Sequence, residues 1–184
     1  MSLHFLDIPE KTARDAAAPY VVLPVPYERT VSYGGGTLKG PEAILKASHE
    51  TEDFDEELMI PLNPKVRTLP ALELEGMSDA KAMNVIENSA KKIITKKRFL
   101  LSLGGEHTIS FPLIKAVRAL YKNICVLHID AHLDLRSKYS GTPLSHACVM
   151  RRVREMKIRT VHAGIRSFSK EEHSYATENN VPIV

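Results

Sequence analysis

The run His128-Ile129-Asp130-Ala131-His132-Leu133-Asp134 directly follows the apolar segment Cys125-Val126-Leu127. If the extended chain continues through this run, alternate side chains share a face, so Asp130, His132 and Asp134 point the same way. Carboxylate and imidazole groups without thiolates suit Mn²⁺ or a similarly hard ion better than structural zinc. Because these groups would repel one another or stay poorly solvated without a cation, the run predicts a metal site.

A second histidine motif, Gly104-Gly105-Glu106-His107, lies upstream and also follows an apolar run. Taken alone, His107 is more typical of a helix start or of the surface; beside the first motif it is a candidate ligand. The candidate ligand set is then His107, Asp130, His132 and Asp134. This set is small for two ions. The site therefore holds either a single ion or further carboxylates from elsewhere in the fold.

His146 ends the stretch Ser140–His146 and precedes a helical pattern that contains Met150 and Val153. An isolated histidine at such a position is typical of an exposed loop. Beside an activated water it becomes a candidate for proton transfer, because an imidazole titrates near neutrality.

Strand-like apolar runs alternate along the chain with helical patterns, which indicates an α/β fold with a mainly parallel sheet. Ligands bind beyond the carboxyl ends of the strands in such sheets, and both histidine motifs fall there. The helices are expected after Gly40-Pro41, after an N-cap at Ser78 and after a Ser169/Glu172 capping box. The predicted strands are Tyr20–Val25, Val66–Leu69, Phe99–Leu103, Ile124–Ile129, Thr160–Ala163 and Val181–Val184.

The composition fits one globular domain, since 43% of the 184 residues are hydrophobic. The net charge of +3 is small, and the basic clusters lack interleaved aromatic residues, so no nucleic-acid partner is expected. No apolar run is long enough to span a bilayer and no signal pattern is present, so no membrane association is expected. Cys125 in an expected buried strand and Cys148 in an expected helix are typical of reduced thiols in a cytoplasmic protein.

The motifs together resemble those of the ureohydrolases, the arginase and agmatinase family, and most of all the agmatinases. The resemblance covers nearly the whole chain. Glu106 stands where the family usually has Asp. The matching segments are Leu23–Tyr27, Gly40–Ile44, Gly104–His107, His128–Asp134, Ser145-His146 and Gly164–Arg166.

The resemblance implies a three-layer α/β/α sandwich, arginase-like, assembled as a homo-oligomer of three or six subunits. It implies that His107, Asp130, His132 and Asp134 are ligands of a cluster of two Mn²⁺ ions. Asp130 would bridge the ions, His107 and Asp134 would favour one ion, and His132 the other. His146 matches the position of the family's proton-transfer histidine.

The implied reaction is the hydrolysis of a small guanidino substrate with release of urea, with agmatine going to putrescine as the expected case. Arginases typically carry an Asn for the substrate α-carboxylate at the position where this chain has Arg136. Agmatine has no such carboxylate. An Arg could instead favour an acidic substrate such as guanidinobutyrate or formiminoglutamate, which is the alternative.

The family also carries a second acidic element, Asp-x-Asp followed by Asp-Pro, and later a Glu that contacts the guanidinium. Neither occurs within residues 1–184. The chain is thus expected to be one domain that represents the N-terminal portion of the family fold and is C-terminally incomplete, with fewer ions or none bound and little hydrolysis. A non-catalytic metal-binding pseudoenzyme and a mononuclear zinc deacetylase of related architecture are the competing hypotheses.

Overall fold

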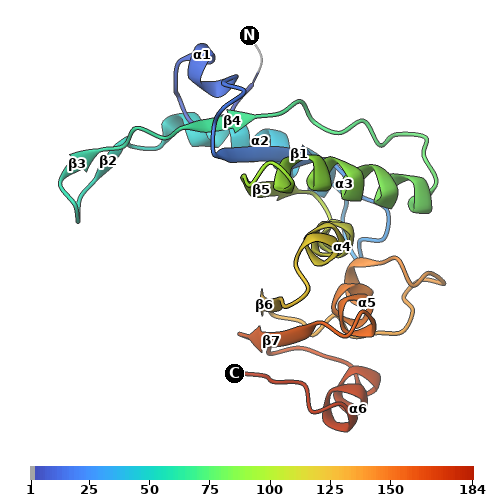
Figure 1. The fold of residues 1–184 in the computed structure, drawn as a ribbon. Helices are drawn as coiled ribbons and strands as arrows, with labels where there is room; N and C mark the ends of the chain where they lie inside the picture. The colour runs from blue at the N-terminus through green and yellow to red at the C-terminus, as the bar shows by residue number, and fades with distance from the viewer. Residues whose placement is uncertain (1–2) are drawn as a thin grey trace.

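The computed structural model describes residues 3–184 and contains two separate parallel sheets (Figure 1). The first sheet has the order β4-β1-β5, and the second pairs β6 with β7. All of these pairings are parallel, as expected from the alternation of strands and helices. The strands are β1 (Tyr20–Val25), β4 (Val66–Thr68), β5 (Phe99–Gly104), β6 (Cys125–Ile129) and β7 (Arg159–Ala163).

The helices between the strands begin where the sequence predicts them. Pro41 lies in the first turn of α2, and the Ser78 side chain caps α3 by accepting from the Lys81 N–H. A small antiparallel hairpin, β2 (Phe54–Asp55) with β3 (Ile60–Pro61), was not predicted. The helices are α1 (Glu10–Ala13), α2 (Gly40–Ala47), α3 (Asp79–Ile94), α4 (Ser110–Leu120), α5 (Val149–Glu155) and α6 (Lys170–Glu178), with 3-10 turns η1 (Thr37–Lys39), η2 (Ser48–Glu50), η3 (His107–Ile109) and η4 (His146–Cys148).

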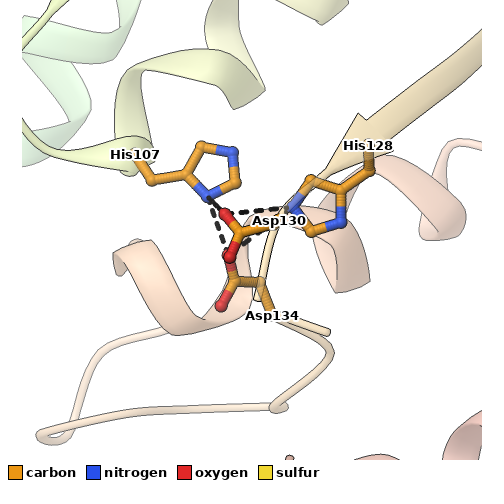
Figure 2. A group of neighbouring side chains, drawn as sticks. All are labelled: His107, His128, Asp130 and Asp134. Carbon is orange, nitrogen blue, oxygen red and sulfur yellow. Dashed lines mark hydrogen bonds and ion pairs between the residues drawn. The ribbon is translucent and has the colours of Figure 1, made fainter. Parts of the chain in front are cut away.

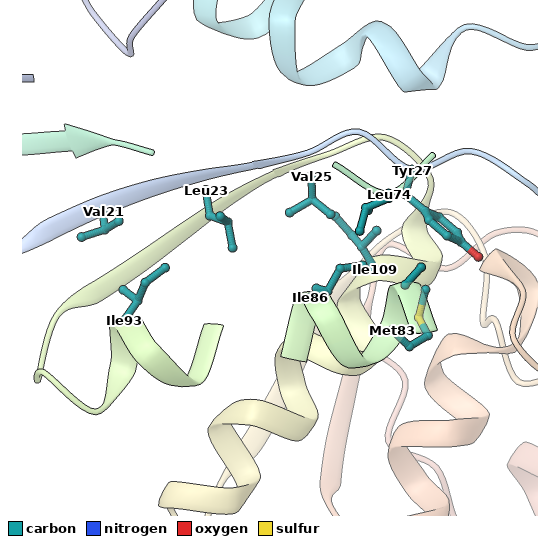
Figure 3. Close-up of a cluster of buried hydrophobic side chains, with 10 residues drawn as sticks. Val21, Leu23, Val25, Tyr27, Leu74, Met83, Ile86, Ile93 and Ile109 are labelled. Atoms are coloured by element: carbon teal, nitrogen blue, oxygen red, sulfur yellow. The ribbon is translucent and has the colours of Figure 1, made fainter. Parts of the chain in front are cut away.

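The first sheet is covered on both faces. Val21, Leu23 and Val25 of β1 pack with Ile86 and other apolar residues of α3 (Figure 3). The intervening Val22 packs with Leu45 of α2 on the opposite face. Because alternate residues of a strand point to opposite faces, α2 and α3 lie on opposite sides of the sheet. The expected α/β sandwich with a parallel sheet is confirmed.

The second sheet is covered on one face. Val126 of β6 packs into a core formed with apolar residues of α5 and α6. On the other face Leu127 is 62% exposed and Ile129 is 76% exposed. Cys125 shares that face and is exposed as well, so the prediction of a buried Cys125 was wrong. The apolar run predicted the strand correctly, but the burial of a strand residue depends on what covers its face of the sheet. Cys148 is buried, as expected.

Val181–Val184 does not form the predicted strand. Its contact with β7 is an isolated bridge between His162 and Ile183. The His162 N–H donates to the Pro182 carbonyl at 3.0 Å, and the Val184 N–H donates to the His162 carbonyl at 2.8 Å. Pro182 has no N–H and cannot extend the ladder. No helix within residues 3–184 is both long and apolar enough to cross a membrane.

The capping box of α6 also holds the loop after the metal motif. The Ser169 side chain accepts from the Glu172 N–H, and the Glu172 carboxylate accepts from the Ser169 N–H at 2.8 Å. The other oxygen of this buried carboxylate accepts from the Leu135 N–H at 3.1 Å. We expect Glu172→Ala to lower the free energy of unfolding by about 1–3 kcal/mol, because the cap is lost and a buried N–H loses its acceptor.

Chemical denaturation measures this effect. The matched control is Glu178→Ala, at the exposed end of the same helix, which should change stability by less than about 0.5 kcal/mol. Equal losses in the two variants would contradict the proposed role of Glu172.

Candidate metal centre

The two histidine motifs meet at the carboxyl ends of β5 and β6. His107 begins η3, three residues after β5 ends, while His128 lies in β6 and Asp130 follows that strand directly. Asp134 completes a group of neighbouring side chains (Figure 2). Each of these residues offers one ligand atom, and these atoms all lie within 4.8 Å of one another. The arrangement has the size and chemistry of a site for one divalent ion.

The closest contact in the group joins His107 Nδ1 to Asp134 Oδ2 at 2.7 Å. Asp130 Oδ2 lies 3.9 Å from His107 Nδ1 and 3.5 Å from His128 Nε2. Two carboxylate oxygens and two imidazole nitrogens thus converge on a common point (Figure 2). The prediction that the Gly-Gly-Glu-His motif and the Asp-rich run lie together is supported by these distances.

Asp134 reaches the group through a turn. Its φ angle is +52°, a left-handed conformation that Asp adopts more readily than most side chains. Its carbonyl accepts from the N–H groups of Met150 and Arg151 at 3.0 and 3.2 Å, which ties the turn to the first turn of α5. β6 ends at Ile129, so strand alternation does not explain why Asp134 faces Asp130.

His132 lies beside this group but outside it. Its side chain is 61% exposed, and its Nδ1 lies 3.4 Å from Asp130 Oδ1, the oxygen that points away from His107. The same Oδ1 accepts from the His132 N–H at 2.8 Å, as in an Asx turn. Asp130 Oδ2 therefore faces His128 and His107, whereas Oδ1 faces His132.

His128 was missed as a site residue in the sequence, although it precedes Asp130 by two positions and so shares its face. Its Nδ1 lies 3.0 Å from Nδ1 of His162, its register partner on β7. His162 Nε2 in turn lies 3.0 Å from the Thr160 hydroxyl oxygen. The buried His128 Nε2 has no hydrogen-bond partner and faces Asp130 Oδ2. A buried nitrogen without a partner that faces a carboxylate fits a site built around a cation.

The charges in the group also suit a cation. Burial would raise the pKa of Asp130, but the His132 N–H and the neighbouring histidines outweigh it and the pKa is lowered. Burial lowers the pKa of His128, and His107 adds to this effect. Near neutral pH the carboxylate is therefore ionised and the imidazole neutral. These are the protonation states that bind divalent metals.

His162 makes stability depend on pH in the metal-free protein. Burial, followed by the effects of His128 and Arg154, lowers the pKa of His162 to about 4. The unfolded chain, with an ordinary pKa of about 6.5, then binds a proton that the folded state does not. Stability should fall as the pH drops from about 6.5 to about 4, by at most about 1.4 kcal/mol per pH unit from this residue.

Denaturation in EDTA across this range measures the slope. His162→Gln should flatten it, and the control His173→Gln, at an exposed position of α6, should leave it unchanged. An unchanged slope in His162→Gln would contradict the assignment.

His146 lies at the start of η4, within a polar network. Its Nδ1 lies 3.2 Å from the Thr30 hydroxyl, and its Nε2 lies 3.1 Å from the Ser32 hydroxyl. Its backbone N–H donates to the same Thr30 oxygen at 3.2 Å. Its ring meets that of Tyr139 edge-on, with 5.2 Å between centroids. His146 is half-buried and held, unlike a free loop histidine.

Glu106 links the His146 network to the metal motif, a role that the sequence did not reveal. Its buried carboxylate accepts from the backbone N–H groups of Arg29 and Thr30 and from the hydroxyls of Thr30 and Thr108. Burial would raise the pKa of Glu106, but these hydrogen bonds outweigh it and the pKa is lowered. The residue next to His107 thereby anchors the segment that contacts His146.

The comparisons with known proteins agree with this geometry. The chain is 37% identical to the N(1)-aminopropylagmatine ureohydrolase of Synechocystis sp., over 91% of this chain and 57% of that protein. It is 35% identical to the agmatinase of Bacillus cereus, over 86% of this chain and 56% of that protein. The chain thus spans less than two thirds of the length of these relatives.

Two solved structures share the fold. The arginase from Medicago truncatula superposes with a TM-score of 0.81 at 29% identity, covering 91% of this chain and 56% of that one. The agmatine ureohydrolase of Thermoplasma volcanium superposes with a TM-score of 0.79 at 29% identity, covering 94% and 59%. The model of the Arginase family matches residues 18–184. The chain belongs to the arginase family.

Proposed function

We propose that this chain supplies the metal-binding and proton-transfer parts of a manganese-dependent ureohydrolase that releases urea from a small guanidino compound, with agmatine as the foremost substrate and putrescine as its product. The observation that carries the proposal is the convergence of His107, Asp130 and Asp134 at the carboxyl ends of two strands. Its named relatives, an agmatinase and an aminopropylagmatine ureohydrolase, support the substrate class.

The two faces of the Asp130 carboxylate support a bridging role. Asp130 Oδ2 faces His107, which Asp134 also contacts. Asp130 Oδ1 faces His132. His107, Asp130 and Asp134 would then hold one ion, and Asp130 with His132 would contribute to a second. When bound, the ions would supply Lewis acidity and an activated water for attack on the guanidinium carbon.

His146 is the proposed proton carrier. Hydroxyl groups contact both of its ring nitrogens, those of Thr30 and Ser32, so the ring is held while each nitrogen keeps a polar partner. A proton can pass through an imidazole because its two nitrogens can exchange donor and acceptor roles. We propose that His146 delivers a proton to the departing amine and recovers it from solvent.

The surroundings of Arg136 favour a substrate without a carboxylate. Its guanidinium lies 3.7 Å from the Glu172 carboxylate and 5.5 Å above the Tyr139 ring. These partners already engage the positive charge of the partly exposed Arg136 side chain. The neighbouring Glu172 carboxylate partly offsets the charge of Arg136, so a guanidino acid or formiminoglutamate gains less from this residue and agmatine is the better fit.

A urea-release assay with Mn²⁺ tests this function. It uses the chain co-expressed with the part of the Synechocystis relative beyond the match, and offers agmatine, aminopropylagmatine, arginine and guanidinobutyrate. We expect urea from agmatine, and a loss of about 10²–10⁴-fold in His146→Asn. His49→Asn, remote from the centre, is the control. Mn²⁺ binding without urea from any substrate would instead favour the pseudoenzyme.

A further inference from the structure

A row of polar side chains leads from His128 away from the metal centre. His128 Nδ1 lies 3.0 Å from His162 Nδ1, and His162 Nε2 lies 3.0 Å from the Thr160 hydroxyl oxygen. This oxygen accepts from Nη1 of Arg154, in α5, at 3.0 Å. We call these four side chains the Arg154–His128 relay. The two histidines and Thr160 are buried, so their hydrogens need partners within the protein.

The direction of the hydrogen bonds is set at the Arg154 end of the relay. A guanidinium only donates, so the Thr160 oxygen accepts from Arg154 and its own hydrogen needs an acceptor. Within residues 3–184, the other hydrogen-bond partner of this hydroxyl is His162 Nε2. This nitrogen therefore accepts, and the hydrogen of the His162 ring lies on Nδ1.

The hydrogen of the His128 ring is then placed as well. Because His162 donates from its Nδ1, His128 Nδ1 accepts, and the hydrogen of the His128 ring lies on Nε2. This N–H faces Asp130 Oδ2 at 3.5 Å and Asp134 Oδ2 at 3.9 Å (Figure 2). A ring nitrogen that carries a hydrogen has no lone pair to offer a metal ion, whereas it attracts the two carboxylates.

The opposite direction of the relay is less favourable. His162 Nε2 would then donate to Thr160, and the buried hydroxyl hydrogen of Thr160 would have no acceptor. The lone pair of His128 Nε2 would face two carboxylate oxygens, so that repulsion would replace attraction. A metal ion bound directly to His128 could offset both costs, and this is the competing interpretation.

We propose that His128 is a positioning residue and not a metal ligand, because the Arg154–His128 relay holds its Nε2–H toward the carboxylates of the metal centre. This role depends on the proposed function, in which His107, Asp130 and Asp134 hold an ion. The N–H reduces the repulsion between the two converging carboxylates without competing for that ion. The His128 ring also stacks on the His107 ring, with 5.3 Å between centroids and 15° between planes, and so supports a proposed ligand.

Nitrogen NMR of the metal-free protein at about pH 8, where an ordinary histidine is neutral, tests the relay without any assay of catalysis. We expect a hydrogen on Nδ1 of His162 and on Nε2 of His128. A hydrogen on Nδ1 of His128 overturns the proposal but leaves the proposed function intact. A chain that shows the expected hydrogens and binds no ion contradicts the proposed function instead.

The same measurement after saturation with Zn²⁺ distinguishes a positioning residue from a ligand. The His128 Nε2–H signal should persist, because the ion binds to other side chains. Loss of this hydrogen, with a shift of Nε2 typical of metal-bound nitrogen, identifies His128 as a ligand and overturns the proposal.

Two threonine variants show whether the relay places the hydrogen. Thr160→Val removes the hydroxyl and should leave both histidines as mixtures of the two neutral forms, whereas Thr160→Ser should keep the parent pattern. Thr177→Val, at an exposed position of α6, is the matched control. A parent-like pattern in Thr160→Val would mean that the hydroxyl does not set the direction, and would reject the relay.

Mn²⁺ titration of two His128 variants completes the test. His128→Gln can keep an N–H close to the position of Nε2 and should bind within about threefold of the parent, whereas His128→Leu should lose about tenfold. Losses of about 100-fold or more in both variants would be those of a lost ligand and would overturn the proposal. An unchanged affinity in His128→Leu, with the fold confirmed by thermal melting, would reject the positioning role.

Discussion

Asp130→Asn is expected to weaken Mn²⁺ binding by at least about 100-fold. Asp130 places one oxygen toward His107 and the other toward His132, so its negative charge can attract a cation on either side of the carboxylate. An Asn side chain still accepts the His132 N–H through one oxygen, which preserves the turn, but it carries no charge and offers a single oxygen. The loss should therefore come from the ligand and not from the fold.

Isothermal titration of EDTA-stripped protein with Mn²⁺ measures the change, and thermal melting confirms the fold. Asp53→Asn, at an exposed position far along the sequence, is the matched control and should bind as the parent does. An affinity for Mn²⁺ within about threefold of the parent in Asp130→Asn would reject the centre. His132→Asn should leave the affinity nearly unchanged, because His132 lies outside the group that would hold the first ion.

The sequence predicted the elements well wherever local pattern decides the structure. β1, β5 and β6 lie within a residue of the predicted runs, and the Ser169/Glu172 capping box forms as expected. Apolar runs and caps act over a few residues, so they can be interpreted without knowledge of the rest of the fold. The placement of the two motifs at the carboxyl ends of parallel strands followed from the alternation of strands and helices.

What the sequence could not predict depends on contacts between distant segments. Alternation placed Asp130, His132 and Asp134 together, but the strand ends at Ile129 and a left-handed turn returns Asp134 to the group while His132 points outward. His128 has the same spacing, but its role depends on a contact with His162, which lies on another strand.

Glu106 is a second residue whose contacts could not be predicted from the sequence. In the sequence it was a conservative departure from the Asp usual in the family, next to the predicted ligand His107. In the structure its buried carboxylate accepts from the N–H groups of Arg29 and Thr30, and the Thr30 hydroxyl contacts both the ring and the backbone of His146. No local pattern connects these positions, because the contacts join segments that are far apart in the chain.

Glu106→Ala should therefore have the largest effect on stability of any single change in this region, about 3–5 kcal/mol. The variant leaves two backbone N–H groups and two hydroxyls without their acceptor in a buried site. Glu106→Gln retains the shape and one acceptor oxygen, so it should cost less, about 1–3 kcal/mol. Urea denaturation measures both, with Glu75→Ala at an exposed position as the control.

The loss of the Glu106 carboxylate should also leave the His146 ring free to move. Once Glu106 is lost, the Thr30 hydroxyl has no fixed acceptor, and the imidazole that it contacts becomes free to change rotamer or tautomer. Nitrogen NMR of the His146 ring observes this directly, without any need for activity. Thr30→Val should reproduce the change and Thr30→Ser should not, since serine keeps the hydroxyl. A ring signal that is the same in Thr30→Val as in the parent would mean that His146 is positioned by its contacts with Ser32, Tyr139 and Ser145.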